Sequence, residues 1–327
     1  MEVVTKKRMM IFSGSSHPEL AGEVADHLGM RLGEVELHRF ANGELYCRYL
    51  ESVRGADAFV IQTHTDHASD GMSVNDHVME QLVMIDALKR ASAKRICAVA
   101  PNFGYARSDK KTLPREAIGA KLVASLFRTA GADRIMSVDL HTGQIQGFSD
   151  RPFDHLTALP LLTGWLADHA GDGERVVVSP DAGRVRLAEK FAGHLDASIA
   201  ILHKRRTAHN VAEMVEVVGD VGGKTAILVD DMIDTAGTIT QAAKILREHG
   251  ASRVIACATH PIFSGPAVER LRDSEIETVV TTNTLPIPED RRLDKLVVLS
   301  IAPIVASALK AVFEDESVSE IFRGENV

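Results

Sequence analysis

The chain has 327 residues, with 45 acidic and 37 basic side chains and a formal net charge of −8 at pH 7. This acidic balance argues against a general binder of nucleic acid or of anionic membranes, because such a protein needs a cationic surface. A chain of this length exceeds the size at which a single hydrophobic core keeps growing, which predicts two domains.

The cysteine and hydropathy patterns indicate a cytoplasmic location. Cys47, Cys97 and Cys257 lie far apart and form no metal-binding spacing, as expected for a reduced cytosolic chain. No window approaches the ~20 apolar residues of a membrane span, and the first ten residues lack the apolar region of a signal peptide. The sequence therefore predicts a cytoplasmic protein without a membrane segment.

Apolar runs and amphipathic stretches alternate along the chain. In the first half, the predicted strands are 9–13, 58–62, 96–100 and 134–138. Apolar residues at helical spacing predict helices around 20–28 and 78–85. In the second half, the predicted strands are 175–178, 198–202, 225–229, 253–259 and 277–281. Near-continuous apolar strands that alternate with helices are typical of parallel sheets covered on both faces, so the sequence predicts an α/β fold.

Two similar α/β domains are expected, each a parallel sheet flanked by helices. The predicted domains are residues 1–152 and 153–307, and residues 308–327 are expected to form a tail helix that returns to the first domain. Ligands of such sheets bind beyond the carboxyl ends of the strands. Functional residues are therefore expected directly after the apolar runs.

The segment DDMIDTAGT (230–238) follows the predicted strand 225–229 and precedes a helix. Small residues and hydroxyls at a helix start present backbone N–H groups that suit a phosphate. The adjacent Asp230 and Asp231 would repel a phosphate, but they suit ribose hydroxyls or a magnesium ion held partly through water. An N-capping cluster is the simpler alternative, although it would not explain paired aspartates after a buried strand.

This run resembles the phosphoribosyl-diphosphate-binding motif of type I phosphoribosyltransferases and of ribose-phosphate diphosphokinases. Other runs resemble motifs of the diphosphokinases, and the resemblance extends from about residue 10 to residue 322. These runs are HRFANGEL (38–45), PNFGYARSDKK (101–111), VDLHTGQIQGF (138–148), VSPDAGRV (178–185), HKRR (203–206), SGP (264–266) and SVSEIF (317–322). The sequence is therefore similar to the phosphate-activated class of ribose-phosphate diphosphokinases.

The resemblance implies two phosphoribosyltransferase-like domains and a kinase-type transferase of nucleotide biosynthesis. ATP would give its β,γ-diphosphoryl group to the anomeric hydroxyl of ribose 5-phosphate, with Mg²⁺ as cofactor, to form 5-phosphoribosyl 1-diphosphate and AMP. The first domain would read ATP and make oligomer contacts, and the second would bind ribose 5-phosphate and diphosphate. A phosphoribosyltransferase, which would make no AMP from ATP, and a non-catalytic regulatory homologue are the competing interpretations.

The resemblance also assigns the sugar-phosphate and metal sites. The ribose 5-phosphate residues would be Gln144, Asp230, Asp231, Asp234, Thr235, Ala236, Gly237 and Thr238. His141 and Asp181 would hold the metal, although His141 could instead only hydrogen-bond the α- or β-phosphate, since magnesium prefers oxygen ligands. Asp181 starts a turn that could cradle the diphosphate, and Arg184 stands there in place of the family's frequent second glycine.

Two further groups complete the implied active site. Lys204 and Arg206 would belong to a catalytic loop that closes over the β- and γ-phosphates, although a solvated basic face is the usual explanation of such a run. The ATP-binding residues would be Phe40, Asn42, Glu44, Arg107, Ser108, Asp109 and His141. Phe40 would stack on adenine in a neighbouring subunit's site, whereas a core phenylalanine beside an Asn-Gly turn is the alternative.

Regulation and assembly follow from the same resemblance. Ser52, Arg54, Ser317 and Ser319 match an allosteric site at which phosphate activates and ADP inhibits. The expected partners are ATP, ribose 5-phosphate and these two effectors, with no nucleic acid. The expected assembly is a homo-oligomer, a hexamer of dimers, whose smallest active unit is the dimer.

Overall fold

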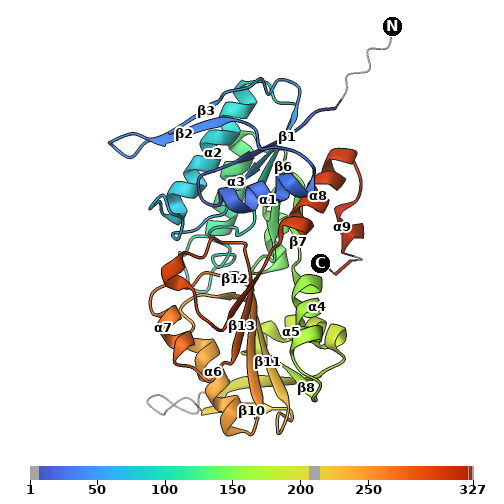
Figure 1. The fold of residues 1–327 in the computed structure, drawn as a ribbon. Coiled ribbons are helices and arrows are strands. Elements are labelled where there is room, and N and C mark those ends of the chain that lie inside the picture. The colour runs from blue at the N-terminus through green and yellow to red at the C-terminus, as the bar shows by residue number, and fades with distance from the viewer. Residues whose placement is uncertain (1–6, 206–213, 323, 326–327) are drawn as a thin grey trace. The chain divides into compact units, whose positions relative to one another are not determined.

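The computed structural model describes residues 7–205, 214–322 and 324–325, and of residues 204, 205, 214 and 215 only the backbone. The chain divides into two compact units. The first comprises the chain up to Thr157 together with 284–288 and the chain from Ser300, and the second comprises 158–283 and 289–299. In each unit helices flank a mainly parallel sheet (Figure 1), which confirms the predicted α/β fold class.

The first unit is built on a five-stranded parallel sheet with the order β1-β4-β5-β6-β7. Its strands are β1 (Met9–Ser13), β4 (Asp57–Ile61), β5 (Arg95–Ala100), β6 (Arg134–Val138) and β7 (Phe153–Leu156). Its helices are α1 (Pro18–His27), α2 (Val74–Arg90), α3 (Gly119–Ala130), the short η1 (Gly143–Phe148), α8 (Ala302–Glu314) and α9 (Val318–Ile321). Every residue of β4 is buried, because neighbouring strands and helices enclose this interior strand.

A hairpin of β2 (Val35–Arg39) and β3 (Leu45–Tyr49) forms a separate two-stranded antiparallel sheet in the first unit. Residues 40–44 connect the two strands. Gly43 lies in the left-handed region at φ +93°, where a side chain would be strained. The Asn-Gly pair therefore forms the turn that its sequence indicates.

The second unit contains a seven-stranded sheet with the order β10-β9-β8-β11-β12-β13-β14. Its strands are β8 (Arg175–Ser179), β9 (Ser198–Arg205), β10 (Met214–Val218), β11 (Thr225–Ile233), β12 (Arg253–Pro261), β13 (Thr278–Thr282) and β14 (Leu296–Leu299). Its helices are α4 (Leu159–His169), α5 (Val185–Leu195), α6 (Gly237–Glu248) and α7 (Ala267–Arg272), with short turns η2 (Ala182–Arg184) and η3 (Glu289–Arg291). The strands are parallel except that β10 runs antiparallel to β9.

Several boundaries differ from those predicted. Strand β7 belongs to the first unit because it pairs with β6, beyond the predicted boundary at residue 152. Helix α8 also belongs there, where it packs against α1, although the prediction assigned its first residues to the second domain. Strand β11 continues through both aspartates to Ile233, because its pairing with β12 continues to Pro261.

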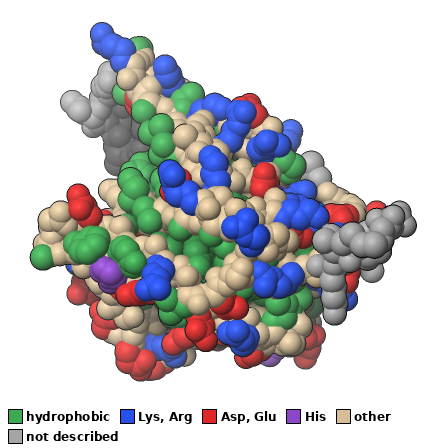
Figure 2. Space-filling view, turned by 90° about the horizontal axis from the view of Figure 1, so that it is seen from above, with side chains coloured by type: hydrophobic (Ala, Val, Ile, Leu, Met, Phe, Trp, Pro, Cys, Tyr) green, Lys and Arg blue, Asp and Glu red, His purple; other side chains and the backbone are tan. Residues whose placement is uncertain are grey.

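Charged side chains of both signs occur among neutral and apolar areas on the face of the molecule shown in Figure 2. None of the described helices is both long enough and apolar enough to cross a bilayer.

Candidate active site

The paired aspartates of the second unit lie at the carboxyl end of its sheet. Strands β8 and β11 are parallel neighbours, so the residues that follow β8 lie beside the last residues of β11. The structure accordingly brings Arg184, from the turn after β8, against Asp230 and Asp231. Arg184 Nε lies 2.8 Å from Asp230 Oδ1, and Arg184 Nη2 lies 2.7 Å from Asp231 Oδ1.

The environment of Asp230 disfavours the ionised form of its carboxyl group. Burial raises its pKa to about 8, the adjacent Asp231 adds to this rise, and the Arg184 guanidinium opposes it. The Asp231 N–H donates to Asp230 Oδ1 at 2.8 Å. The two carboxylates are therefore held close together in a poorly hydrated place, with an arginine as their counter-ion.

The turn between β11 and α6 presents an open helix start. Ala236 lies in the left-handed region at φ +59°, and α6 begins after it without a side-chain cap from the described residues. The Phe263 and Ser264 N–H groups donate to the carbonyls of Ile233 and Asp234, both at 3.0 Å, and so hold the turn. Because the first N–H groups of a helix have no partner within the helix, a helix start of this kind is the arrangement that binds phosphate.

Asp181 organises the turn that contains Arg184. Its Oδ1 accepts the Gly183 N–H at 2.7 Å, and its carbonyl accepts the Ser179 hydroxyl at 2.6 Å. Asp181 itself is exposed. The carboxylate thus lies at the carboxyl end of β8, where it can reach a metal ion or a solvated ligand.

In the first unit, Asp109 contacts the segment that follows β6. Asp109 is 4% exposed, and its Oδ2 accepts hydrogen bonds from Thr142 Oγ1 at 2.6 Å and from Gln144 Nε2 at 2.8 Å. The resemblance implied separate ATP and ribose roles for Asp109 and Gln144. The structure places the two side chains in direct contact, between the loop after β5 and the turn after β6.

The other predicted residues of that loop differ in exposure. Arg107 is exposed, whereas Ser108 is half-buried. The Ser108 hydroxyl accepts the Gly119 N–H at 3.0 Å and contacts the Ala117 carbonyl at 3.5 Å. Ser108 therefore also anchors the start of α3, a structural task that the sequence did not indicate.

Phe40 is an exposed aromatic residue and not a core residue, which corrects the alternative interpretation. It is 47% exposed and lies edge-on to His38, with ring centres 4.9 Å apart. In the turn, Asn42 Oδ1 accepts the Glu44 N–H at 3.2 Å. The hairpin thus presents a free aromatic surface, as a stacking contact requires.

The remaining predicted residues are widely distributed. Lys204 lies in β9, where its backbone pairs with Val215, and not in a loop after a strand ending at 202. Arg206 lies outside the described residues. His141 follows β6 in the first unit, and among the described residues no cluster of three or more His, Cys, Asp or Glu side chains forms a metal site.

The predicted effector residues Ser52, Arg54, Ser317 and Ser319 are all exposed residues of the first unit.

A buried polar network around His64 was missed, although His64 itself follows closely after the apolar run 58–62. His64 Nδ1 accepts the Gly104 N–H at 2.8 Å, and His64 Nε2 lies 3.0 Å from Gln81 Oε1. Asn102 Nδ2 donates to the His64 carbonyl at 2.7 Å. These contacts connect the end of β4 to the loop that carries Arg107 and Asp109.

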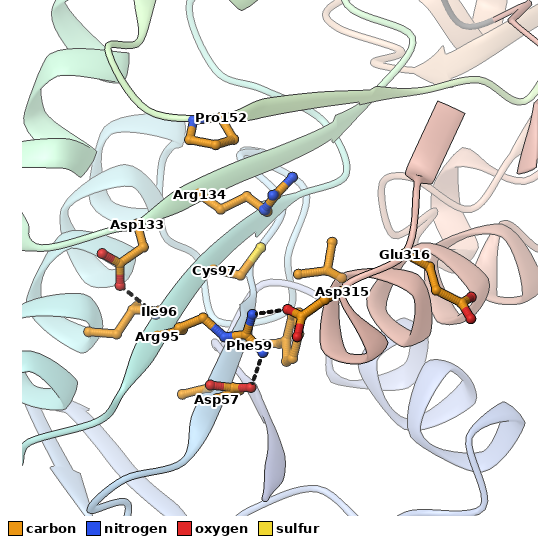
Figure 3. A pocket seen from close by; sticks show the side chains of 12 residues that line it. Asp57, Phe59, Arg95, Ile96, Cys97, Asp133, Arg134, Pro152, Asp315 and Glu316 are labelled. Atoms are coloured by element: carbon orange, nitrogen blue, oxygen red, sulfur yellow. Dashed lines mark hydrogen bonds and ion pairs between the residues drawn. The ribbon is translucent and has the colours of Figure 1, made fainter. Parts of the chain in front are cut away.

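A cavity of about 290 Å³ lies at the amino ends of β4, β5 and β6, opposite the carboxyl edge (Figure 3). Arg95 donates to Asp57, at the start of β4, and to Asp315, at the end of α8. Lys7 and Arg95 lower the pKa of Asp315 to about 2. These ion pairs join the chain after α8 to the sheet, and no sequence motif indicated them.

Comparison with known proteins identifies the family. Residues 9–131 match the model described as the N-terminal domain of ribose phosphate pyrophosphokinase, and residues 205–323 match the phosphoribosyl synthetase-associated domain. The chain is 55% identical over 320 residues to a ribose-phosphate pyrophosphokinase of Streptomyces avermitilis, with 97% of each chain covered. It is 52% identical over 323 residues to one of Mycobacterium tuberculosis, with 98% of this chain and 97% of the relative covered.

A solved structure gives the same result. The crystal structure of phosphoribosylpyrophosphate synthetase from Mycobacterium smegmatis matches with a TM-score of 0.89 and 54% identity. The match covers 94% of this chain and 100% of the other. Both units and nearly all the motifs noted above therefore fall within one family, and this chain is an enzyme of the ribose-phosphate pyrophosphokinase (diphosphokinase) family.

Proposed function

We propose that this protein transfers the β,γ-diphosphoryl group of ATP to the anomeric hydroxyl of ribose 5-phosphate, giving 5-phosphoribosyl 1-diphosphate and AMP. The observation that carries this proposal is the arrangement at the end of β11, where two carboxylates precede an open helix start. A sugar phosphate needs both elements, because its hydroxyl groups require hydrogen-bond acceptors and its phosphate requires N–H donors.

Ribose 5-phosphate would bind along residues 230–238. Its 5-phosphate would accept hydrogen bonds from the N–H groups and hydroxyls of Thr235, Gly237 and Thr238, while Asp230 and Asp231 would accept from the ribose hydroxyls. Asp234, Ala236 and Gln144 would complete the site. The small residues at the start of α6 favour this arrangement, because they let the phosphate approach the backbone closely.

ATP would bind to residues of the first unit. Phe40 would stack on adenine, which its exposed ring permits, and Asn42 and Glu44 would read the edge of the base. Arg107 and His141 would contact the phosphates. Ser108 and Asp109 would act mainly by fixing the loop, since both already bond to neighbouring protein groups.

The chemistry would be an in-line displacement. The anomeric oxygen bonds to the β-phosphorus, the bond from that phosphorus to the α,β-bridging oxygen breaks, and AMP leaves with the bridging oxygen while the hydroxyl proton is released to solvent. Catalysis of such a transfer consists mainly of positioning and charge neutralisation. Lys204 and Arg206 would supply positive charge near the β- and γ-phosphates.

Magnesium fits this site as an ion held mostly by substrate phosphates. Such an ion needs only one or two protein ligands, and Asp181 offers an exposed carboxylate for it. Asp181 would hold the ion, with His141 as the second ligand or as a donor to phosphate. When bound, magnesium would neutralise charge on the diphosphoryl group.

Regulation and assembly belong to the same proposal. Ser52, Arg54, Ser317 and Ser319 would bind phosphate as activator or ADP as inhibitor, and the exposure of all four permits this. The protein would work in the cytoplasm as a homo-oligomer, a hexamer of dimers, in which the hairpin turn at Phe40 contributes to a neighbouring ATP site.

Product analysis tests the proposed reaction. The protein is incubated with ATP, Mg²⁺ and ribose 5-phosphate, and the products are resolved by mass. We expect AMP and 5-phosphoribosyl 1-diphosphate in equal amounts, and neither product when ribose 5-phosphate is omitted. Formation of ADP with a singly phosphorylated sugar, or no AMP at all, would contradict the proposal.

A further inference from the structure

Arg184 occupies the position from which the proposed sugar site and the proposed diphosphate turn can both be reached. Its backbone closes the turn after β8, since the Arg184 N–H donates to the Asp181 carbonyl at 3.4 Å. Its side chain extends away from that turn to the end of β11, where it bridges Asp230 and Asp231. The backbone of Arg184 therefore belongs to the proposed diphosphate turn, and its guanidinium belongs to the proposed sugar site.

The ion pairs of Arg184 are shielded from solvent. The side chain of Arg184 is 18% exposed, and those of Asp230 and Asp231 are 25% and 6% exposed. The attraction within ion pairs at this degree of burial is stronger than in exposed pairs, because water screens it less. Without a ligand, the two neighbouring carboxylates are paired with this guanidinium.

The same contact competes with a sugar. Asp230 Oδ1 already accepts the Asp231 N–H at 2.8 Å, and Arg184 Nε lies 2.8 Å from the same oxygen. A ribose hydroxyl that approaches this oxygen therefore competes with the arginine. A displaced guanidinium needs another anion, and the turn at Asp181–Gly183, in which its own backbone lies, is where the proposed reaction brings a diphosphate.

We infer that Arg184 is an exchangeable counter-ion, which pairs with Asp230 and Asp231 when the ribose site is empty and with the diphosphoryl group when that site is filled. The inference rests on the proposed function, and it adds a residue that recognises the product's diphosphate. Arginine suits this exchange because its planar group binds carboxylate and diphosphate oxygens in the same two-pronged manner. Binding of the sugar would thus release a positive charge at the place where negative charge arrives.

The test compares two affinities in the full-length protein. Equilibrium titrations at fixed Mg²⁺ give the dissociation constants of ribose 5-phosphate and of 5-phosphoribosyl 1-diphosphate for the wild type, Arg184→Gly, Arg184→Lys and Arg186→Ala. Arg186 is an exposed arginine at the start of α5, so its variant controls for loss of one positive charge nearby.

The preference for the diphosphate compound is the dissociation constant of ribose 5-phosphate divided by that of 5-phosphoribosyl 1-diphosphate. In Arg184→Gly we expect this preference to fall at least ten-fold. Arg184→Lys, which keeps the charge but loses the two-pronged geometry, should lower this preference less than Arg184→Gly does, and Arg186→Ala should leave it at the wild-type value. If Arg184 only clamped the aspartates, both affinities would change together and the preference would stay constant, which would overturn the inference.

The outcome is separable from that of the proposed function. A wild type that makes AMP from ATP and ribose 5-phosphate, combined with an unchanged preference in Arg184→Gly, would refute the counter-ion exchange alone. A wild type that neither binds ribose 5-phosphate nor makes AMP would refute both.

Discussion

His64 shows how one buried side chain fixes a loop that carries proposed nucleotide-binding residues. Because its Nδ1 accepts the Gly104 N–H, the ring proton must lie on Nε2, which faces Gln81. Burial is the main reason that its pKa falls to about 4, so the ring is neutral at pH 7. A proton on Nδ1 would remove the acceptor that holds Gly104.

The depressed pKa of His64 predicts a loss of stability in acid. Below its ordinary pKa of 6.5 the unfolded chain binds a proton at this residue, while the folded chain does not until about pH 4. The unfolding free energy should therefore fall by up to about 3 kcal/mol as the pH drops through this window. Urea titrations at pH 7 and pH 4.5 measure the fall.

A neutral replacement isolates the contribution of His64. In His64→Gln the difference in unfolding free energy between pH 7 and pH 4.5 should shrink by about 2 kcal/mol, because no titrating group remains at this position. His27→Gln, at an exposed histidine at the end of α1, is the matched control and should behave as the wild type. Equal pH dependence in wild type and His64→Gln would show that His64 does not stay neutral in the folded protein.

Arg95 connects elements that are distant in the sequence, namely β4, β5 and the end of α8 (Figure 3). Asp57 has a side chain only 4% exposed, and Arg95 is its ion-pair partner. Side-chain hydrogen bonding to Asp57 contributes most to the raised pKa of Arg95. Removal of the arginine would leave a buried carboxylate without its counter-ion, which is costly.

We expect Arg95→Met to lower the unfolding free energy by about 2 kcal/mol, a value reduced from that of a fully buried pair because Arg95 is partly exposed. The double variant Arg95→Met/Asp57→Asn should recover part of this loss, since it also removes the buried charge. Arg90→Ala removes a solvent-exposed pair with Asp86 and should cost much less than Arg95→Met. Urea denaturation measures all three, and a loss in Arg95→Met no larger than that in Arg90→Ala would contradict the account.

The sequence predicted individual elements well where apolar runs were buried on both faces. Strands β4 and β5 agree closely with the runs 58–62 and 96–100. The antiparallel strand β10 could not be located, because its residues lie beyond the basic run 203–206 and its place depends on pairing with β9. The extension of β11 through Asp230 and Asp231 likewise depends on β12, and local sequence does not encode such pairing.

At the site, residue types were predictable but contacts were not. The segment 230–238 indicated sugar-phosphate chemistry from its carboxylates and small residues alone. That Arg184 bridges the two aspartates depends on β8 and β11 being neighbours, which no local pattern states. The contact of Gln144 with Asp109 is similarly a consequence of tertiary structure.

At the scale of the whole molecule, an acidic protein is proposed to act on two strongly anionic substrates. With a net charge of −8, attraction for these substrates must come from local groups and not from the overall field. The open start of α6, Arg184 and the exposed Arg107 are such groups among the described residues. The family match extends over both units, as an enzyme that needs a nucleotide and a sugar phosphate together would require.

An isotope experiment tests the central claim most directly, namely that the sugar's anomeric oxygen attacks the β-phosphorus of ATP. ATP labelled with ¹⁸O at the α,β-bridging position is incubated with the protein, Mg²⁺ and ribose 5-phosphate, and both products are analysed by mass. We expect the AMP to carry all of the label and the phosphoribosyl diphosphate none. Label retained in the sugar product, or ADP as the nucleotide product, would contradict it.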